Sequence, residues 1–567
     1  MRLPSSFLLV SGCFFLSGLA GLIYETAWTQ QFAAVFGTAE LALAAVLAAY
    51  MTGLALGAVL AGHLVDRIRR PVWLYALLEL GIGASALAVP HAIRLAGVVQ
   101  AMVLGQHELP STDGSTAILV VYVTSSFAIL LVPTAMMGAT LPLLARHLVH
   151  REHQIASRVG ALYAINTIGA AAGTLLAAFV LLPHLGLGAT VWTGAGINAA
   201  VFLLAAGLDR SSASGRSLGG RETPFGEPDI GIANVPEGRW ILPMIFLSGA
   251  VSFTLEILWT RLLTLLLGGS VYAFATMLAS FLAGIALGAS WGARIASDAR
   301  RAAWGFASAQ LAAAVLTLAA FLSVDRLPGL ARAVVESSGA GNTAISWLLC
   351  GLTLLPGAIA FGATFPCAVR ILTRHPAMAA SASGRVFAWN TAGAIVGSLA
   401  AGYVVLPRLG FADTMVTATS VCLLLALFAC LGTGTRRHRL AFVLVTGLGI
   451  ATLVAIPSPN RRLCFATMCS QPETIPGRSP SSTACRRPFR SQAPSFSRGS
   501  GVAPRSCSSS SPSIGAWCPT GCPSRPFSHP GRGRARVWWH AGCLCYPSPP
   551  TPTPGPCSSS ASERVLP

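Results

Sequence analysis

Long apolar blocks follow one another along the first 456 of the 567 residues, and they constrain the fold more than any other feature of the sequence. Crossing about 30 Å of hydrocarbon takes roughly 20 apolar residues in a helix. A bilayer core offers no water to backbone polar groups, so such a chain spans it as helices. We expect twelve membrane-spanning helices and one shorter candidate. They lie at residues 7–34, 40–65, 72–90, 117–145, 159–182, 188–208, 241–267, 271–296, 303–323, 344–371, 385–406 and 412–432, with the shorter candidate at 440–456.

The composition excludes a soluble cytosolic enzyme. The chain is 53% hydrophobic and 10% charged, whereas soluble domains carry about 25% charged residues. The formal net charge of +19 comes entirely from Arg, because the sequence contains no Lys. Residues 1–456 hold 25 Arg and 17 acids, and residues 457–567 hold 13 Arg and two acids. We therefore expect the lipid bilayer as the partner of the apolar part and no nucleic acid; protein partners stay unknown.

The Arg residues fall mainly in alternate loops, and loops rich in positive charge stay in the cytoplasm. This pattern predicts a cytoplasmic N-terminus and an integral protein of the bacterial inner (plasma) membrane. The Arg-rich loops contain Arg67, Arg69, Arg70, Arg146, Arg151, Arg158, Arg210, Arg216, Arg221, Arg239, Arg294, Arg300, Arg301, Arg370, Arg374, Arg385, Arg436, Arg437 and Arg439. The opposite loops contain Arg94, Arg326, Arg332 and Arg408.

An internal repeat runs through the apolar part. Phe15-Leu16-Ser17-Gly18 recurs 231 residues later as Phe246-Leu247-Ser248-Gly249, and the offset becomes 224 further along. Agreement over nearly 200 residues indicates that the apolar part arose by duplication. The other matched positions are Glu25 with Glu256, Trp28 with Trp259, Gly53 with Gly284, Gly57 with Gly288, Gly138 to Pro142 with Gly362 to Pro366, Asn166 with Asn390, and Pro183 with Pro407.

Six spans in each copy make the two repeats enter the membrane in the same direction. Parallel repeats of this kind form the two halves of major facilitator transporters. The sequence therefore predicts an all-α polytopic membrane protein of two parallel six-helix repeats resembling the major facilitator fold. We expect the first repeat at 1–208, a cytoplasmic linker at 209–238, the second repeat at 239–434 and a low-complexity tail at 457–567, with residues 435–456 as a candidate for a thirteenth transmembrane helix.

Glu25 and Glu256 are the first candidates for a substrate site. A carboxylate inside a membrane costs about 2.5–3.5 kcal/mol on insertion scales, so it usually faces a bundle interior or a wet cavity. Each acid precedes a Trp by three residues, and one helical turn brings Trp28 or Trp259 beside it. Aromatic faces favour an ammonium group. The alternatives are a position near the headgroups or a structural pair with an Arg such as Arg261.

Three further polar positions are candidates within the apolar blocks. Glu79 has Gln310 as its counterpart, so the two copies differ at a polar site that could bind a ligand or lie at the membrane interface. Asn166 and Asn390 lie among Gly and Ala residues. Small residues permit close helix approach and Asn can hydrogen-bond across it, so helix packing is the stronger interpretation and substrate binding the second.

A Gly-Ala-Thr-x-Pro segment occurs once in each copy and predicts an interrupted helix. Interrupted helices at matching places of two halves point to a transport site, although a plain kink fits equally well. The glycine-rich stretches from Gly53 to Gly62 and from Gly284 to Gly292 resemble helix-contact faces. The helix-break candidates are Pro133, Gly138, Thr140, Pro142, Pro356, Gly362, Thr364 and Pro366.

Together these motifs resemble the membrane region of fused membrane spermidine-synthase-like proteins over residues 7–456. The resemblance implies a multi-pass region resembling a major facilitator, followed by an aminopropyltransferase-like domain with a Rossmann-type methyltransferase fold. It implies transfer of an aminopropyl group from decarboxylated S-adenosylmethionine to putrescine. Such transfer needs carboxylates and a base, and a Rossmann site needs a glycine-rich turn.

Residues 457–567 contain no Asp and no alternating strand and helix pattern, so no catalytic residue can be assigned, and we expect no cofactor and no metal. Their Pro, Ser and Arg content is typical of disorder. A tail translated out of frame from a GC-rich gene is the interpretation that we favour. Cysteines in the tail lack paired zinc-ligand spacing.

The sequence is consistent with three functions. The first is a transporter-like membrane domain that handles a small cationic substrate such as a polyamine near Glu25, Glu256 and Glu79. The second is a membrane-anchored aminopropyltransferase whose catalytic domain is lost. The third is a membrane scaffold that does not transport.

Overall fold

The structure is a computed structural model, and it describes residues 5–36, 40–104, 116–216, 238–267, 270–327, 329–330, 333–334, 342–373 and 375–433, with residues 443, 447 and 449. Most of the expected linker, the thirteenth helix apart from these three positions, and the whole tail lie outside the described residues. All described residues belong to the compact unit Met1–Thr474.

The first repeat consists of six α-helices and a short π-helical segment. In chain order they are α1 (Ser5–Phe36), α2 (Glu40–Leu64), α3 (Pro71–Leu104), α4 (Thr116–Leu148), α5 (Ile155–Leu176), the π-helical segment Ala177–Leu181 and α6 (Leu182–Arg216).

The second repeat has the same order, with one helix divided in two. Its helices are α7 (Ile241–Leu267), α8 (Val271–Ile295), α9 (Ala299–Leu322), α11 (Asn342–Thr353), α12 (Leu355–Leu372), α13 (Ala379–Ala400), the π-helical segment Ala401–Val405 and α14 (Leu406–Thr433).

Every one of the twelve expected spans is helical, and ten candidate membrane spans are found in the described part of the chain. One of the ten, Glu152–Arg210, covers two expected spans because the helices join through the π-helical segment. The helix α13 is not among them. It carries Arg, Asn and Ser residues and packs between helices of both repeats. The predicted fold class, an all-α polytopic membrane protein, is confirmed.

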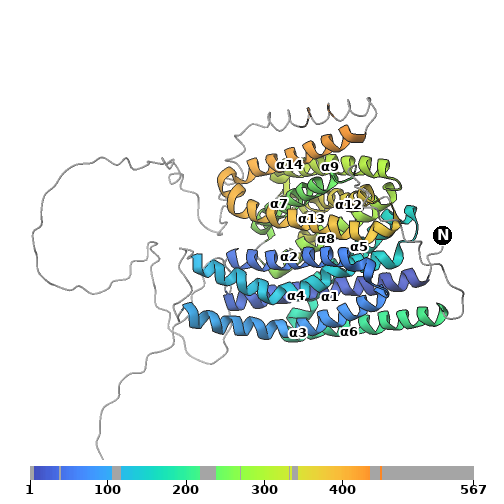
Figure 1. Cartoon of the computed structure of the whole chain (residues 1–567). Helices are drawn as coiled ribbons and strands as arrows, with labels where there is room; N and C mark the ends of the chain where they lie inside the picture. Colours follow the sequence, from blue (N-terminus) through green and yellow to red (C-terminus); the bar gives the residue numbers. More distant parts are fainter. Residues whose placement is uncertain are drawn as a thin grey trace, which may run out of the picture. The chain divides into compact units, whose positions relative to one another are not determined.

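Helix contacts repeat between the two halves. In the first repeat α1 packs on α5, α2 on α4 and α3 on α6; in the second, α7 packs on α13, α8 on α12 and α9 on α14. The repeats meet where α5 packs on α8 and where α13 packs on α2. These two contacts are equivalent, because α13 is the counterpart of α5 and α2 is the counterpart of α8. Figure 1 shows the two groups of roughly parallel helices, coloured blue to teal and green to orange.

A kink near the start of α6 is reproduced near the start of α14. Gly186 and Gly410, which are 224 residues apart, both have a φ of 76°. This left-handed region costs an L-residue with a side chain about 1 kcal/mol or more. Each glycine follows a π-helical segment of five residues. The duplication therefore extends to local backbone geometry that the sequence alignment did not reveal.

The expectation of helix breaks at every Gly-Ala-Thr-x-Pro segment is wrong. The helix α4 runs through Pro133 and Pro142, and α12 runs through Pro366. A proline removes one backbone donor, yet the surrounding helices hold these segments in a continuous helix. Among the described residues of α4, α11 and α12, the interruption lies at Leu354, two residues before Pro356, where α11 ends and α12 begins.

Thr140 and Thr364 each donate a hydrogen bond from Oγ1 to a backbone carbonyl one turn earlier, at 2.6 Å in both cases. Gly138 and Gly362 lie against the backbones of α2 and α8, where a Cβ atom would come within 2.0 Å and 2.1 Å of a carbonyl oxygen. The glycine-rich stretches of α2 and α8 face the same contacts, so their predicted role as helix-contact faces is confirmed. This motif packs helices together.

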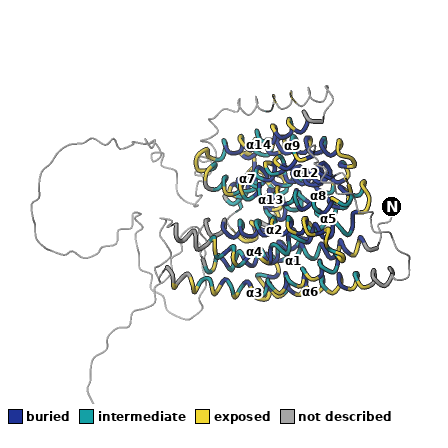
Figure 2. The backbone as a smooth tube through the Cα atoms, viewed as in Figure 1, coloured by how far each residue is buried: buried dark blue, intermediate teal, exposed yellow. Residues whose placement is uncertain are grey.

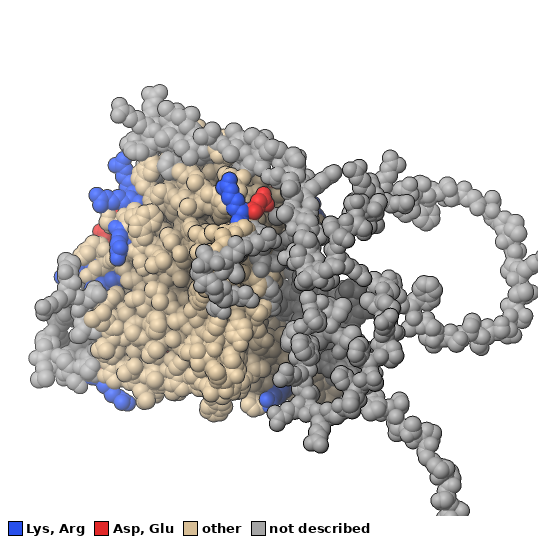
Figure 3. Space-filling model, turned by 180° about the vertical axis from the view of Figure 1, so that it is seen from behind, with Lys and Arg blue, Asp and Glu red and all other residues tan. Residues whose placement is uncertain are grey.

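The surface of the helical body suits a lipid environment. Figure 2 shows buried residues where helices meet and exposed residues along the outer helices such as α3 and α6. Large apolar side chains lie exposed there, including Met102, Trp192 and Leu203. On the face in Figure 3, uncharged atoms cover most of the surface and Arg side chains gather mainly along one edge.

Candidate functional site

Two carboxylates from different repeats lie within electrostatic reach of each other inside the helical body. Glu25 lies on α1 and Glu256 on α7, and their side chains are close enough for their charges to interact. No salt bridge joins either carboxylate to an Arg within the described residues. Oε2 of Glu256 is buried and has no hydrogen-bond partner in that part of the chain. The structure therefore brings together the two acids that the sequence paired by repeat symmetry.

The two carboxylates have different surroundings. Tyr50 of α2 lies within electrostatic reach of Glu25, and its hydroxyl donates to the carbonyl of Gly21 at 3.4 Å and lies 3.7 Å from Sδ of Met137. The position equivalent to Tyr50 in the second repeat is Phe281, which has no hydroxyl.

The two tryptophans are core residues. Trp28 is 1% exposed and stacks on Tyr24, with ring centroids 5.2 Å apart and an angle of 9° between the planes. Trp259 is 3% exposed and belongs to the apolar core of the second repeat. The face of Trp28 that meets Tyr24 is thus unavailable to an ammonium group.

Glu79 belongs to a separate polar network inside the first repeat. It is fully buried on α3 and accepts a hydrogen bond from Nδ2 of Asn198 on α6 at 2.5 Å. Tyr24 on α1 donates to Oδ1 of the same Asn198 at 2.7 Å. The side chains of Ser17 and Tyr75 also approach the Glu79 carboxylate. This network joins α1, α3 and α6 and does not include Glu25.

The second repeat keeps a reduced form of this network. Gln310 on α9 is fully buried and donates from Nε2 to Oγ of Ser248 at 2.6 Å. Ser17 and Ser248 are matched residues of the repeated Phe-Leu-Ser-Gly motif, and Asn198 corresponds to Cys422. Tyr24, Tyr75 and Asn198 were not predicted from the sequence as members of this network. The repeated Ser opposite Glu79 or Gln310 was the signal that could have located the network.

Asn166 and Asn390 lie at equivalent helix contacts. A Cβ atom on Gly18 would come within 2.2 Å of the Asn166 carbonyl oxygen, and one on Gly249 would come equally close to that of Asn390. Both Asn residues therefore sit where α1 meets α5 and α7 meets α13. These contacts favour the packing interpretation of the two residues.

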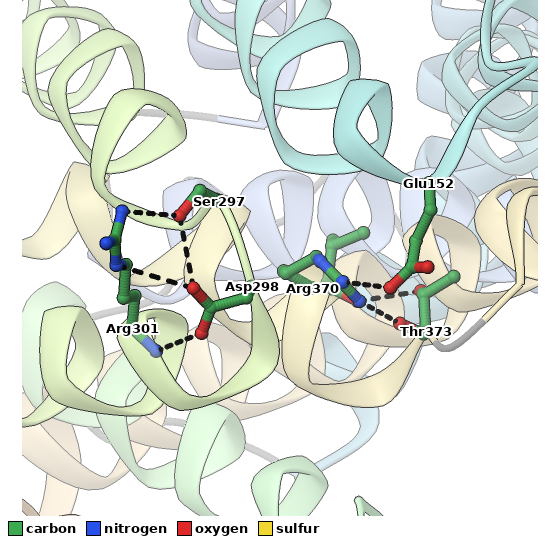
Figure 4. A network of polar contacts seen from close by, with 7 residues as sticks. Glu152, Ser297, Asp298, Arg301, Arg370 and Thr373 are labelled. Carbon is green, nitrogen blue, oxygen red and sulfur yellow. Dashed lines mark hydrogen bonds and ion pairs between the residues drawn. The ribbon is translucent and has the colours of Figure 1, made fainter.

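At the end of the bundle where α2, α4, α8 and α12 finish, here called the Arg-rich end, polar contacts join the repeats. The buried guanidinium of Arg370 on α12 pairs with Glu152 of the first repeat at 2.5 Å and donates to the Thr373 carbonyl at 2.7 Å (Figure 4). Nearby, Tyr163 of α5 stacks on Phe365 of α12 with centroids 4.3 Å apart. The repeats are in direct contact at this end.

The same view shows how α9 begins at the Arg-rich end. Asp298 is its N-cap and accepts a hydrogen bond from the backbone N–H of Arg301 at 2.8 Å (Figure 4). This bond, which requires the ionised carboxylate, lowers the pKa of Asp298 below its usual value. Of the two polar groups in Figure 4, the one at Asp298 caps a helix, and the pair between Glu152 and Arg370 joins the two repeats.

Among the described residues, no group of three or more His, Cys, Asp or Glu side chains could hold a metal ion. No protein-family model matches the chain, and no curated protein matches it.

Solved structures do match. A bacterial homologue of the iron transporter ferroportin, in an outward-facing state with soaked iron, is 12% identical with a TM-score of 0.47, covering 75% of this chain and 100% of that chain. The human organic anion transporter MFSD10 (TETRAN) is 16% identical with a TM-score of 0.45, covering 76% of this chain and 100% of that chain. Similarity of this extent assigns no substrate to the present chain.

Proposed function

We propose that this multi-pass membrane protein transports a small organic cation, which binds between the two repeats at Glu25 and Glu256. One observation carries the proposal: the two carboxylates come from different repeats, interact with each other and form no salt bridge with an Arg among the described residues. The pair belongs to neither repeat alone, so a movement of one repeat against the other changes the site.

Charge balance points to a dication as the substrate. Like charges that act on each other at low dielectric repel, and each carboxylate costs free energy inside the membrane. A diammonium compound would neutralise both carboxylates at once. A polyamine such as putrescine has this charge pattern, and the resemblance to the membrane region of spermidine-synthase-like proteins supports the same substrate class.

Transport by parallel repeats requires alternating closure of the two ends of the bundle. The pair between Glu152 and Arg370 and the stack of Tyr163 on Phe365 hold the Arg-rich end together. We propose that these contacts separate when the site opens toward that end. The Arg pattern supports a cytoplasmic position for this end, with a cytoplasmic N-terminus in a bacterial inner membrane.

The proposal includes the domain organisation predicted from the sequence, with repeats at 1–208 and 239–434 joined by a linker at 209–238. An aminopropyltransferase activity would depend on residues beyond 456, and these lie outside the described residues. No feature of the described helices favours it. A scaffold that does not transport is the outcome to be distinguished by experiment.

The proposal is tested by uptake of labelled putrescine into liposomes that contain the full chain. We expect saturable uptake that falls at least about tenfold in Glu25→Gln and in Glu256→Gln, since each change removes a charge-assisted contact of about 1.5–3 kcal/mol. Thr193→Ala, which alters an exposed hydroxyl on α6, should transport normally. Equal leakage through all four proteins would favour the scaffold.

A further inference from the structure

A cavity of about 20 Å³ lies beside Glu256 within the second repeat. Side chains from α7, α8, α9, α11 and α12 surround it, and Trp259 and Phe281 form part of its wall. The buried, unpartnered Oε2 of Glu256 belongs to a residue that lines this cavity. A space of this size accommodates about one water molecule.

Three hydroxyl-bearing residues line the same cavity. Ser252 on α7, Thr317 on α9 and Thr353 on α11 are 7%, 4% and 4% exposed. Oγ1 of Thr353 donates to the Leu349 carbonyl at 2.7 Å, which leaves its lone pairs able to coordinate a cation. One carboxylate-bearing residue and three hydroxyl-bearing residues therefore line a space for a single small particle.

The first repeat provides an internal comparison, because the duplication gives every lining residue a counterpart. The residues that match Ser252, Thr317 and Thr353 are apolar or lack a side chain. They are Gly21, Ala86 and Ile129, in that order. The counterpart of Phe281 is Tyr50, whose hydroxyl bonds to Gly21 and so enters the matching region. The three hydroxyl-bearing lining residues of the second repeat therefore have no hydroxyl-bearing counterpart at the matched positions of the first, whereas the carboxylate is present in both.

The junction between α11 and α12 lies beside the cavity and leaves one backbone carbonyl without its helical donor. The helix α11 ends at Thr353, and both Thr353 and Leu354 line the cavity. Pro356 removes the usual helical donor to the carbonyl of Leu352, while hydrogen bonds from the Leu354 N–H to Cys350 and from the Ala358 N–H to Leu354 continue the helical pattern on both sides. Broken helices of transporters coordinate Na⁺ through such carbonyls and helix ends.

From this arrangement we propose that the cavity binds one Na⁺ ion, held by the carboxylate of Glu256 and the hydroxyl oxygens of Ser252, Thr317 and Thr353. Hard cations prefer oxygen ligands. A single carboxylate balances a monovalent ion, whereas a divalent ion would leave an unpaired charge in the membrane interior. The inference rests on the same Glu256 as the proposed function, and because one carboxylate balances one positive charge, Na⁺ occupies the site in turn with the dication and exchanges with it.

The test uses the purified full chain without any polyamine, so it reports Na⁺ binding even if the proposed transport fails. Binding of ²²Na⁺ and the thermal unfolding midpoint are measured in Na⁺, with choline or K⁺ as the replacement. We expect saturable binding and a midpoint that rises with Na⁺ and not with choline or K⁺. Thr317→Val should weaken the apparent affinity at least about tenfold, and Thr317→Ser, which keeps the hydroxyl, should restore it.

The control is Thr419→Val, which removes a buried hydroxyl of α14 that bonds to Met415 and does not line the cavity. Its Na⁺ affinity should stay at the wild-type value. Stability that is the same in Na⁺ and choline, or an equal loss of affinity in Thr419→Val, would overturn the proposal. Stabilisation that depends on pH alone would also overturn it, because it would indicate a protonated Glu256 beside a water molecule.

Discussion

At the scale of single residues, intramembrane acids could be found in the sequence, but their partners could not. Glu25, Glu79 and Glu256 stood out because carboxylates are rare and costly in apolar helices. The hydrogen bond from Tyr24 to Asn198 joins residues 174 positions apart, and local periodicity carries no information about such a contact. The structure also separates Glu79 from the pair of Glu25 and Glu256, which the sequence had grouped together.

The network around Glu79 supports a prediction about stability. Asn198→Ala removes the donor to Glu79 and the acceptor of Tyr24 and leaves both groups buried, so it should cost about 2–4 kcal/mol. Glu79→Gln should cost less, and the double variant should show a coupling of about 1–3 kcal/mol. Unfolding of the detergent-solubilised protein measures all three, with Thr193→Ala on the same helix as the control. Additive effects of the two changes would contradict the network.

At the scale of helices, the sequence predicted where elements lie better than how they bend. All twelve expected spans are helical, and the glycine-rich stretches make the expected close contacts. The proline motifs were misread, since Pro133, Pro142 and Pro366 all lie inside continuous helices. Tertiary packing overrides the local preference of proline here, because neighbouring helices fix the backbone on both sides. At Gly186 and Gly410 the opposite occurred: the backbone is kinked, and the sequence had not predicted a kink there.

Packing at the repeated glycine motif gives a second stability prediction. Gly138→Ala places a methyl group 2.0 Å from the carbonyl oxygen of Leu54, so α2 and α4 must separate at a cost of about 1–3 kcal/mol. Gly351→Ala is the matched control, since no atom lies within 4 Å of a Cβ there, and helix propensity should stabilise it by up to about 1 kcal/mol. Thermal unfolding distinguishes the two variants. Equal midpoints would contradict the close contact of α2 with α4.

At the scale of the whole molecule, duplication was the most informative property of the sequence. Two constant offsets predicted parallel repeats, and equivalent helix pairs in the structure agree with them. Symmetry could not predict where the copies differ. The contact of Glu152 with Arg370 and the cavity beside Glu256 each occur without a counterpart of the same composition in the other repeat. Such differences arise from side chains that converge only in the folded protein, between the repeats for Glu152 and Arg370 and within the second repeat for the cavity.

Equilibrium binding of labelled putrescine to the purified full chain tests whether Glu25 and Glu256 form a binding site for a dication. If Glu25 and Glu256 together bind one dication between the repeats, the wild-type protein binds one putrescine per chain. Glu25→Gln and Glu256→Gln should each weaken binding at least about tenfold, while Glu79→Gln, which alters the separate network, should leave the affinity within about twofold. Wild-type affinity in both Glu25→Gln and Glu256→Gln would contradict the account.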